Sequence, residues 1–199
     1  MNQEPNSILQ HARLDELEHA LAEVTHTAVE AYYTYTHKHA LRTAHYAEVL
    51  SGVLELPENE RWATVQAAFL HDIGKIEISD QLIGKPGPLT SAEYEVVKYH
   101  AVIGARIVEK MQGLQALVPL VRHHHERWDG KGYPDRLRAG EIPRGARIVA
   151  LADALDAMLT HRPYRRALTF EQARREIASC SGTQFDPIVV NAFFKWADQ

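Results

Sequence analysis

Residues 67–75 read AAFLHDIGK, a short stretch that combines an apolar helical run with a break. The run delivers His71 and Asp72 side by side, and Ile73-Gly74 interrupt the pattern, so a helix is predicted to end at this pair. An unpaired carboxylate is costly to bury, whereas a divalent metal ion removes that cost, because imidazole and carboxylate are both good metal ligands. For an isolated pair, a helix-end histidine beside a solvated aspartate would be the simpler explanation. The rest of the chain therefore has to show whether other ligands accompany this pair.

Helical periodicity extends over almost every long segment, and no pair of alternating runs joined by a tight turn suggests a substantial sheet. The sequence therefore predicts an all-α fold, a helical bundle. Helices are expected over about residues 36–54, 57–71, 90–111, 114–127 and 146–161. Thr169 with Gln172, and Asp186 with Pro187, are expected to open two more. The glycines and prolines of residues 75–89 predict a loop.

An N-terminal helix is expected over about residues 7–30, where Leu14, Leu17, Leu21, Val24 and Ala28 form one apolar seam. This helix either packs on its own domain or serves as a dimerisation or linker helix, so a homodimer is a candidate assembly. We therefore expect a helical extension over residues 1–34 and a single domain over residues 35–199.

Composition narrows the range of functions. The 199 residues carry a formal net charge of −4, which offers no broad attraction for nucleic acid or anionic lipid. No signal peptide or run of about 18 apolar residues is visible, and the single Cys180 excludes an internal disulfide framework. These observations argue against nucleic-acid and membrane partners and predict a cytoplasmic protein. The 12 histidines stand out, since histidine is a common transition-metal ligand near neutral pH.

A later helix supplies acidic side chains. Residues 146–159, ARIVALADALDAML, are apolar on nearly every face, yet Asp153 and Asp156 lie one turn apart. Exposure of that edge would explain both acids. Ligation of a metal by Asp153, with Asp156 bonding to a nearby ligand or to the backbone, also explains both and is our prediction.

Several histidines can join this site. His100 lies on the buried stripe of its helix, and His124 and His125 end a helix that enters a glycine-rich loop. Adjacent helical residues point about 100° apart, so both histidines reach one centre only near a helix end, or when the centre lies between them. A pair of metals satisfies that geometry, and His123 is expected to face solvent or to support a ligand. On the helix over residues 36–54, periodicity alone does not choose among His37, His39 and His45.

Taken together, these residues resemble the HD-GYP domain, a branch of the HD metal-dependent phosphohydrolase superfamily. The resemblance covers about residues 35–194. It rests on the ordered motifs YTHKHALR (35–42), HDIGK (71–75), KPGPLT (85–90), HAVIG (100–104), HHERWDGKGYP (124–134), GEIPRGARI (140–148), ADALDAM (152–158) and RPYR (162–165). The chain departs from the family pattern at Ala101, where proline is frequent.

The resemblance implies a site for two metals. It selects His39, which stands three residues before Arg42, and it implies that one metal is held by His39, His71, Asp72 and Asp153. The second would share Asp72 as a bridge and add His100, His124 and His125. Asp156 and Arg42 are expected to support these ligands. Some members carry a glutamate at the position of Tyr35 and bind a third metal, so two divalent ions are expected here, iron or manganese first, with nickel or zinc as alternatives.

The implied activity is hydrolysis of cyclic di-GMP to the linear dinucleotide pGpG, with a second cut to GMP left open, and with Asp72 and Lys75 as catalytic residues. Lys75 would contact the scissile phosphate, and Tyr133 would stack on a base or rim the pocket. Further charge for the phosphates would come from Lys85, Arg162 and Arg165. For these basic residues, an exposed loop with a structural ion pair is the alternative.

Three other functions stay open. The chain could act on another cyclic dinucleotide such as cyclic GMP-AMP, or it could be an HD nucleotidase for mononucleotides, which the intact GYP segment disfavours. A non-enzymatic alternative is a cyclic-dinucleotide sensor or an interaction module, for example one that docks to a diguanylate cyclase of the GGDEF type. The complete ligand set favours an enzyme over the sensor.

Overall fold

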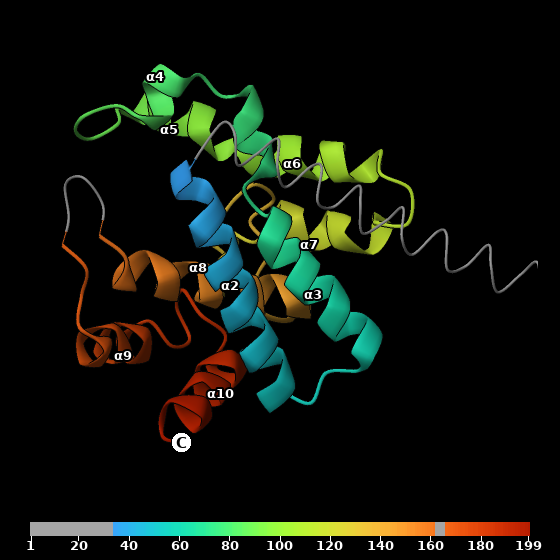
Figure 1. Cartoon of the computed structure of the whole chain (residues 1–199), viewed down its shortest axis with the longest axis vertical. Coiled ribbons are helices and arrows are strands. Elements are labelled where there is room, and N and C mark those ends of the chain that lie inside the picture. The colour runs from blue at the N-terminus through green and yellow to red at the C-terminus, as the bar shows by residue number, and fades with distance from the viewer. Residues whose placement is uncertain (1–33, 162–165) are drawn as a thin grey trace, which may run out of the picture. The chain divides into compact units, whose positions relative to one another are not determined.

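The computed structural model describes residues 34–161 and 166–199. Within them the regular structure is helical, apart from one isolated bridge between Ser181 and Phe185, which confirms the all-α prediction (Figure 1). The elements are α2 Thr34–Val53, α3 Glu58–Leu70, η1 Ile73–Glu77, α4 Asp80–Ile83, α5 Ser91–Lys98, α6 His100–Glu109, η2 Gln115–Leu117, α7 Val118–His123, η3 Ala139–Glu141, α8 Arg144–Leu159, α9 Phe170–Ser179 and α10 Pro187–Ala197.

The chain divides into two units, residues 1–38 and 39–199, and the second contains every element from α3 onward. The helix expected over residues 7–30 lies outside the described residues, so the N-terminal extension and its role in dimerisation stay predictions. Among the residues that are described, no helix is both long enough and apolar enough to cross a membrane.

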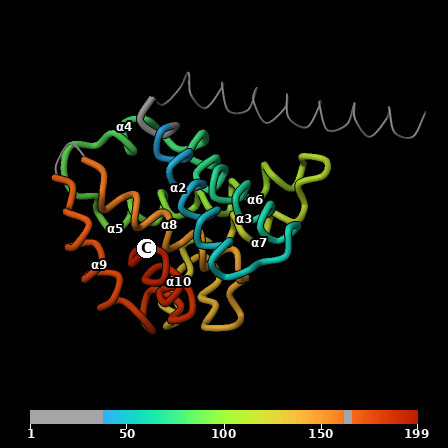
Figure 2. Tube along the Cα trace, turned by 60° about the horizontal axis from the view of Figure 1, so that its bottom comes forward, coloured from blue at the N-terminus to red at the C-terminus, as the bar shows by residue number. Residues whose placement is uncertain are grey.

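Helix α8 forms the centre of the second unit. It packs against α3 and α7 on one side and against α9 and α10 on the other, as both views show (Figures 1 and 2). Its apolar sequence follows from this position, because Ile148, Leu151 and Leu155 are completely buried, and each such side chain contributes about 1.5–3 kcal/mol to folding. The acids Asp153 and Asp156 project instead toward His39 of α2.

The helix expected over residues 90–111 is in fact two helices, α5 and α6, which are separated at Tyr99. The break lies where Gly74 of η1 crosses the start of α6. A Cβ atom on Gly74 would lie only 2.0 Å from the carbonyl oxygen of His100 and 2.5 Å from the amide nitrogen of Gly104. Such close backbone contact requires glycine. Sequence periodicity could not predict the break, because the break depends on a crossing with another segment.

Two other expected boundaries also change. The loop expected over residues 75–89 contains part of η1 and the short helix α4, and the helix expected over residues 114–127 consists of η2 and α7 and ends at His123. The two expected helix caps are confirmed, since Thr169 caps α9 and the Asp186 side chain accepts a hydrogen bond from the first turn of α10. Thr90 and Glu93 also form a reciprocal capping box at α5.

Candidate metal centre

The seven predicted ligands come from five segments that meet in one place. They are His39 on α2, His71 and Asp72 at the end of α3, His100 at the start of α6, His124 and His125 directly after α7, and Asp153 on α8. Two groups have ligand atoms within 4.8 Å of one another: Asp72, His100, His124 and His125 form one, and His39, His71 and Asp72 form the other. Asp153 belongs to neither group by this measure, but its Oδ1 lies 3.2 Å from His39 Nε2 and 4.0 Å from His71 Nε2.

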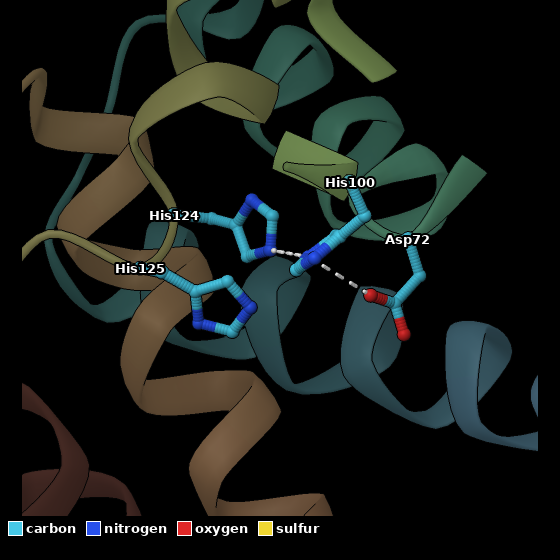
Figure 3. A group of neighbouring side chains, drawn as sticks. All are labelled: Asp72, His100, His124 and His125. Carbon is cyan, nitrogen blue, oxygen red and sulfur yellow. Dashed lines mark hydrogen bonds and ion pairs between the residues drawn. The ribbon is translucent and has the colours of Figure 1, made fainter. Parts of the chain in front are cut away.

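Asp72 is common to both groups. Its Oδ1 lies 3.4 Å from His100 Nε2, and its Oδ2 lies 3.5 Å from His71 Nε2, so the two oxygens of one carboxylate face two different histidine groups. Figure 3 shows Asp72 beside His100, with the rings of His124 and His125 gathered on the other side of His100. A carboxylate in this position can serve two cations at once.

Backbone carbonyls fix the orientation of three of the histidine rings. His71, His100 and His124 each place Nδ1 2.6–2.7 Å from the carbonyl oxygen of the residue three positions earlier. A carbonyl oxygen only accepts hydrogen bonds, so Nδ1 must carry the proton in each ring. The neutral ring then offers the lone pair of Nε2 to the centre, which is the arrangement by which outer hydrogen bonds orient histidine ligands.

The facing nitrogens of His100 and His124 test whether this site suits a metal. Their Nε2 atoms are 3.3 Å apart, and both are acceptors if both rings are neutral. Burial lowers the pKa of each imidazole, so a proton shared between them is unfavourable. Two buried lone pairs that face each other beside a carboxylate require a cation. The residues present therefore fit a divalent metal.

An acidic side chain holds the His39 ring on its Nδ1 side. Its Nδ1 lies 2.6 Å from Asp156 Oδ2, while its Nε2 faces Asp153. Arg42 donates to both oxygens of Asp156, which is almost completely buried. The expected supporting positions of Asp156 and Arg42 are therefore found. Burial lowers the pKa of His39, but the hydrogen bonds to Asp153 and Asp156 outweigh it and raise that pKa to about 9.

Most groups at the centre are in the forms that metals bind. His39 is the exception, because its raised pKa keeps a proton that a bound metal would displace. Burial lowers the pKa of His125 to about 3, which keeps its imidazole neutral. Burial raises the pKa of Asp72, yet the positive charge of Lys75, the strongest of the opposing interactions, lowers it well below the usual range. Burial likewise acts against ionisation of Asp153, and the hydrogen bond from His39 more than offsets it. Neutral imidazoles and ionised carboxylates are the ligating forms.

The loop after His125 is tied down behind the centre. The Tyr133 ring lies against the His125 ring, with centroids 4.8 Å apart, and its peptide bond to Pro134 is cis. The next residue, Asp135, accepts hydrogen bonds from Arg122 and His123 through its carboxylate and donates its N–H to the buried Glu126, 2.7 Å away.

Sequence patterns did not predict this anchoring. His123 was expected to face solvent or to support a ligand. It instead contacts Asp135 and so helps to hold the loop in place. No spacing pattern links residues 122 and 123 to residue 135, although the acidic residue directly after the GYP segment was a usable signal.

The predicted substrate contacts are placed as follows. Lys75 Nζ lies 2.5 Å from Asp72 Oδ2, at the edge of the centre. Lys85 forms an ion pair with Glu93, 2.6 Å away, and so has a structural partner. Arg162 and Arg165 lie outside the described residues. A role of any of these side chains, or of Tyr133, in holding substrate stays a prediction.

Comparison with known proteins places this chain in a family. The model of the HD domain family matches residues 16–189. A cyclic di-GMP phosphodiesterase of Thermotoga maritima is 46% identical over 80% of this chain, and a 3′3′-cGAMP-specific phosphodiesterase of Vibrio cholerae is 37% identical over 86% of it. The chain covers 44% and 33% of the lengths of these two relatives, less than half of each.

A solved structure agrees at the level of the fold. An HD-GYP-type protein of Bdellovibrio bacteriovorus superposes with a TM-score of 0.65 over 81% of this chain and 52% of its own, at 18% identity. The family match covers most of the chain, and so do relatives named as cyclic di-GMP phosphodiesterases, such as that of Thermotoga maritima. The chain therefore belongs to the HD domain family, in its HD-GYP branch.

Proposed function

We propose that this chain is a metal-dependent phosphodiesterase that opens cyclic di-GMP to the linear dinucleotide pGpG. The observation that carries the proposal is the shared carboxylate of Asp72, whose two oxygens face two separate histidine groups. This arrangement supports a centre of two divalent ions, one held by His39, His71, Asp72 and Asp153, the other by Asp72, His100, His124 and His125. Iron or manganese are the first candidates, because mixed imidazole and carboxylate ligands suit both.

A bound pair of cations would lower the pKa of a water molecule and offset the charge that develops on the attacked phosphodiester. The side chains around the pair determine where the substrate sits. Hydrolysis forms a bond from the water oxygen to phosphorus and breaks the bond to the ribose O3′, and the departing oxygen must gain a proton. Lys75 is suited to provide that proton or to hold a phosphate oxygen, because its ammonium group lies beside Asp72 and is partly exposed.

Cyclic GMP-AMP is the second candidate substrate, since relatives named for either cyclic dinucleotide are similar to this chain. The two linkages have the same phosphodiester chemistry, so the metal centre does not separate them. A discriminating contact has to lie where the bases bind.

The test is product formation from cyclic di-GMP and 3′3′-cyclic GMP-AMP, followed by chromatography, with protein loaded anaerobically with iron or manganese. We expect two metal ions per chain and linear product. Asp72→Ala should lose both metals and all hydrolysis. Glu171→Ala, which removes an exposed acid on α9, should keep both metals and the hydrolysis. Fully metallated protein that forms no product from either compound would contradict the enzyme and favour a sensor.

A further inference from the structure

Helix α5 places two unassigned side chains beside the GYP loop. Tyr94 and Lys98 are four residues apart, so they share one face of the helix. The Lys98 ammonium nitrogen lies 4.9 Å from the ring centroid of Tyr94 and 5.5 Å from that of Tyr133. The three side chains therefore form one cluster, although Tyr133 comes from a loop far away in the sequence.

This cluster continues outward from the metal centre. The ring of Tyr133 packs on His125, and Tyr94 meets Tyr133 edge to face, with centroids 6.4 Å apart. Tyr94 is 46% exposed, so much of its ring is open to solvent. A nucleotide whose phosphate lies at the histidines holds its base one sugar away, and this aromatic row leads in an outward direction from the histidines.

The contacts within the protein give little reason to keep the aromatic ring of Tyr94 so exposed beside a lysine. An exposed cation–π contact contributes about 0.5–1 kcal/mol, and a surface ion pair such as that of Lys98 with Glu95 contributes about 0–1 kcal/mol. A nucleobase stacked on an aromatic side chain contributes about 1–3 kcal/mol. Base stacking is the strongest of these three interactions, so the exposed ring is better explained by a ligand base than by its contacts within the protein.

The ammonium group of Lys98, next to the Tyr94 ring, indicates which base would bind. An ammonium group has three N–H donors, and the Glu95 contact uses one of them. Guanine presents two adjacent acceptors, O6 and N7, to which lysine commonly donates, whereas adenine presents N7 beside the N6 amino donor. A lysine donor at this position would thus be matched by guanine and opposed by adenine.

We propose that Tyr94 and Lys98 form a guanine subsite, in which a base stacks on the exposed ring of Tyr94 and Lys98 donates to O6 and N7. The subsite rests on the proposed phosphodiesterase function and gives it a selectivity. Cyclic di-GMP has two guanines, cyclic GMP-AMP has one and cyclic di-AMP has none, so preference should fall in that order.

The experiment compares KM and kcat of the metal-loaded protein for cyclic di-GMP and cyclic di-AMP. Tyr94→Ala should raise KM for cyclic di-GMP by roughly 5–150-fold, the loss of one stacked base. Tyr94→Phe keeps the ring and should stay within about threefold of the wild type. Lys98→Met should raise KM for cyclic di-GMP by about tenfold and leave KM for cyclic di-AMP unchanged, so that the selectivity between them is lost.

Two controls separate this subsite from the metal centre. Bis(p-nitrophenyl) phosphate is a phosphodiester without a base, and all three variants should hydrolyse it at the wild-type rate. Lys110→Met removes a lysine directly after the end of α6, about 15 Å along the helix from His100. It should change neither KM nor kcat for either dinucleotide. An equal loss in Tyr94→Ala and Tyr94→Phe, or unchanged selectivity in Lys98→Met, would overturn the guanine subsite while leaving hydrolysis intact.

If the wild-type protein turns over neither dinucleotide, the enzyme proposal fails independently. Calorimetric titration of the loaded protein with cyclic di-GMP then tests the subsite through the same variants. A Kd weakened in Tyr94→Ala and Lys98→Met supports the subsite, and a Kd unchanged in both, or the absence of binding by the wild type, overturns it.

Discussion

Replacing Gly74 by alanine should separate the two halves of the metal centre. The added Cβ would lie 2.0 Å from His100 O and 2.5 Å from Gly104 N, and ordinary contact begins at 3.4 Å, so η1 and α6 must move apart by about 1 Å or more. Both obstacles are backbone atoms, which cannot rotate away as a side chain can. We expect a loss of about 3 kcal/mol in the free energy of unfolding, the upper part of the range for overpacking.

The same displacement should remove one of the two metals. Asp72 precedes Gly74 by two residues, and its Oδ1 lies 3.4 Å from His100 Nε2. Metal-to-ligand bonds to nitrogen and oxygen are about 2.0–2.2 Å long and tolerate little change. A shift of about 1 Å would therefore impair the group of His100, His124 and His125, whereas His39 and His71 stay in place on α2 and α3.

Urea unfolding in excess EDTA measures the packing effect separately from metal binding, and elemental analysis of the loaded protein measures metal content. The melting temperature should fall by roughly 6–12 °C for about 3 kcal/mol in a chain of this size. Gly52→Ala is the matched control, because nothing lies within 4 Å of its added Cβ and alanine favours a helix by up to about 1 kcal/mol. Wild-type stability and two bound metals in Gly74→Ala would refute the reasoning.

Three further changes test separate parts of the fold. Asp156→Asn should weaken metal binding at His39 by about 10–100-fold, measured by competition with a chelator, because the carboxylate that orients the ring is lost. The hydrogen bond from Lys85, and next those of the helix cap, lower the pKa of Glu93 to about 2. Glu93 therefore stabilises the fold above its unfolded pKa near 4.5, and this effect is lost as the pH falls toward 2. The difference in the free energy of unfolding between the wild type and Glu93→Gln, measured with urea, should shrink over that pH range, and a constant difference would contradict this prediction. Arg147→Met should cost about 3 kcal/mol in urea unfolding, because it leaves the buried carboxylate that caps α10 without its ion pair, and a loss below about 1 kcal/mol would show that the carboxylate does not need this partner.

The sequence was most informative where one short segment carries both structure and chemistry. His71 and Asp72 could be predicted together because the helix ends at this pair, and the acids of α8 could be recognised because their neighbours are apolar. The choice of His39 over His37 and His45 needed the family resemblance, since all three lie on one helix.

What sequence reasoning could not supply is the set of contacts between segments. The close crossing of Gly74 and His100 divides an expected helix into α5 and α6, and this division accompanies the placement of His100 at the first turn of its own helix. The contact of Tyr94 with Tyr133 joins α5 to a loop nearly 40 residues later. Periodicity reports which face of an element is buried, but it does not report which other element covers that face.

The ligands of the centre differ in how they are held, and the exception is His39, on the half that it shares with His71. His71, His100 and His124 are oriented by backbone carbonyls, which no side-chain substitution removes. His39 is oriented by the side chain of Asp156, which in turn depends on Arg42. The affinity of the His39 side for its metal can therefore be changed by residues that never touch the metal, whereas the other side changes only with its ligands or with the path of the backbone, as at Gly74. This difference is why Asp156→Asn and Gly74→Ala are expected to act on opposite halves of one centre.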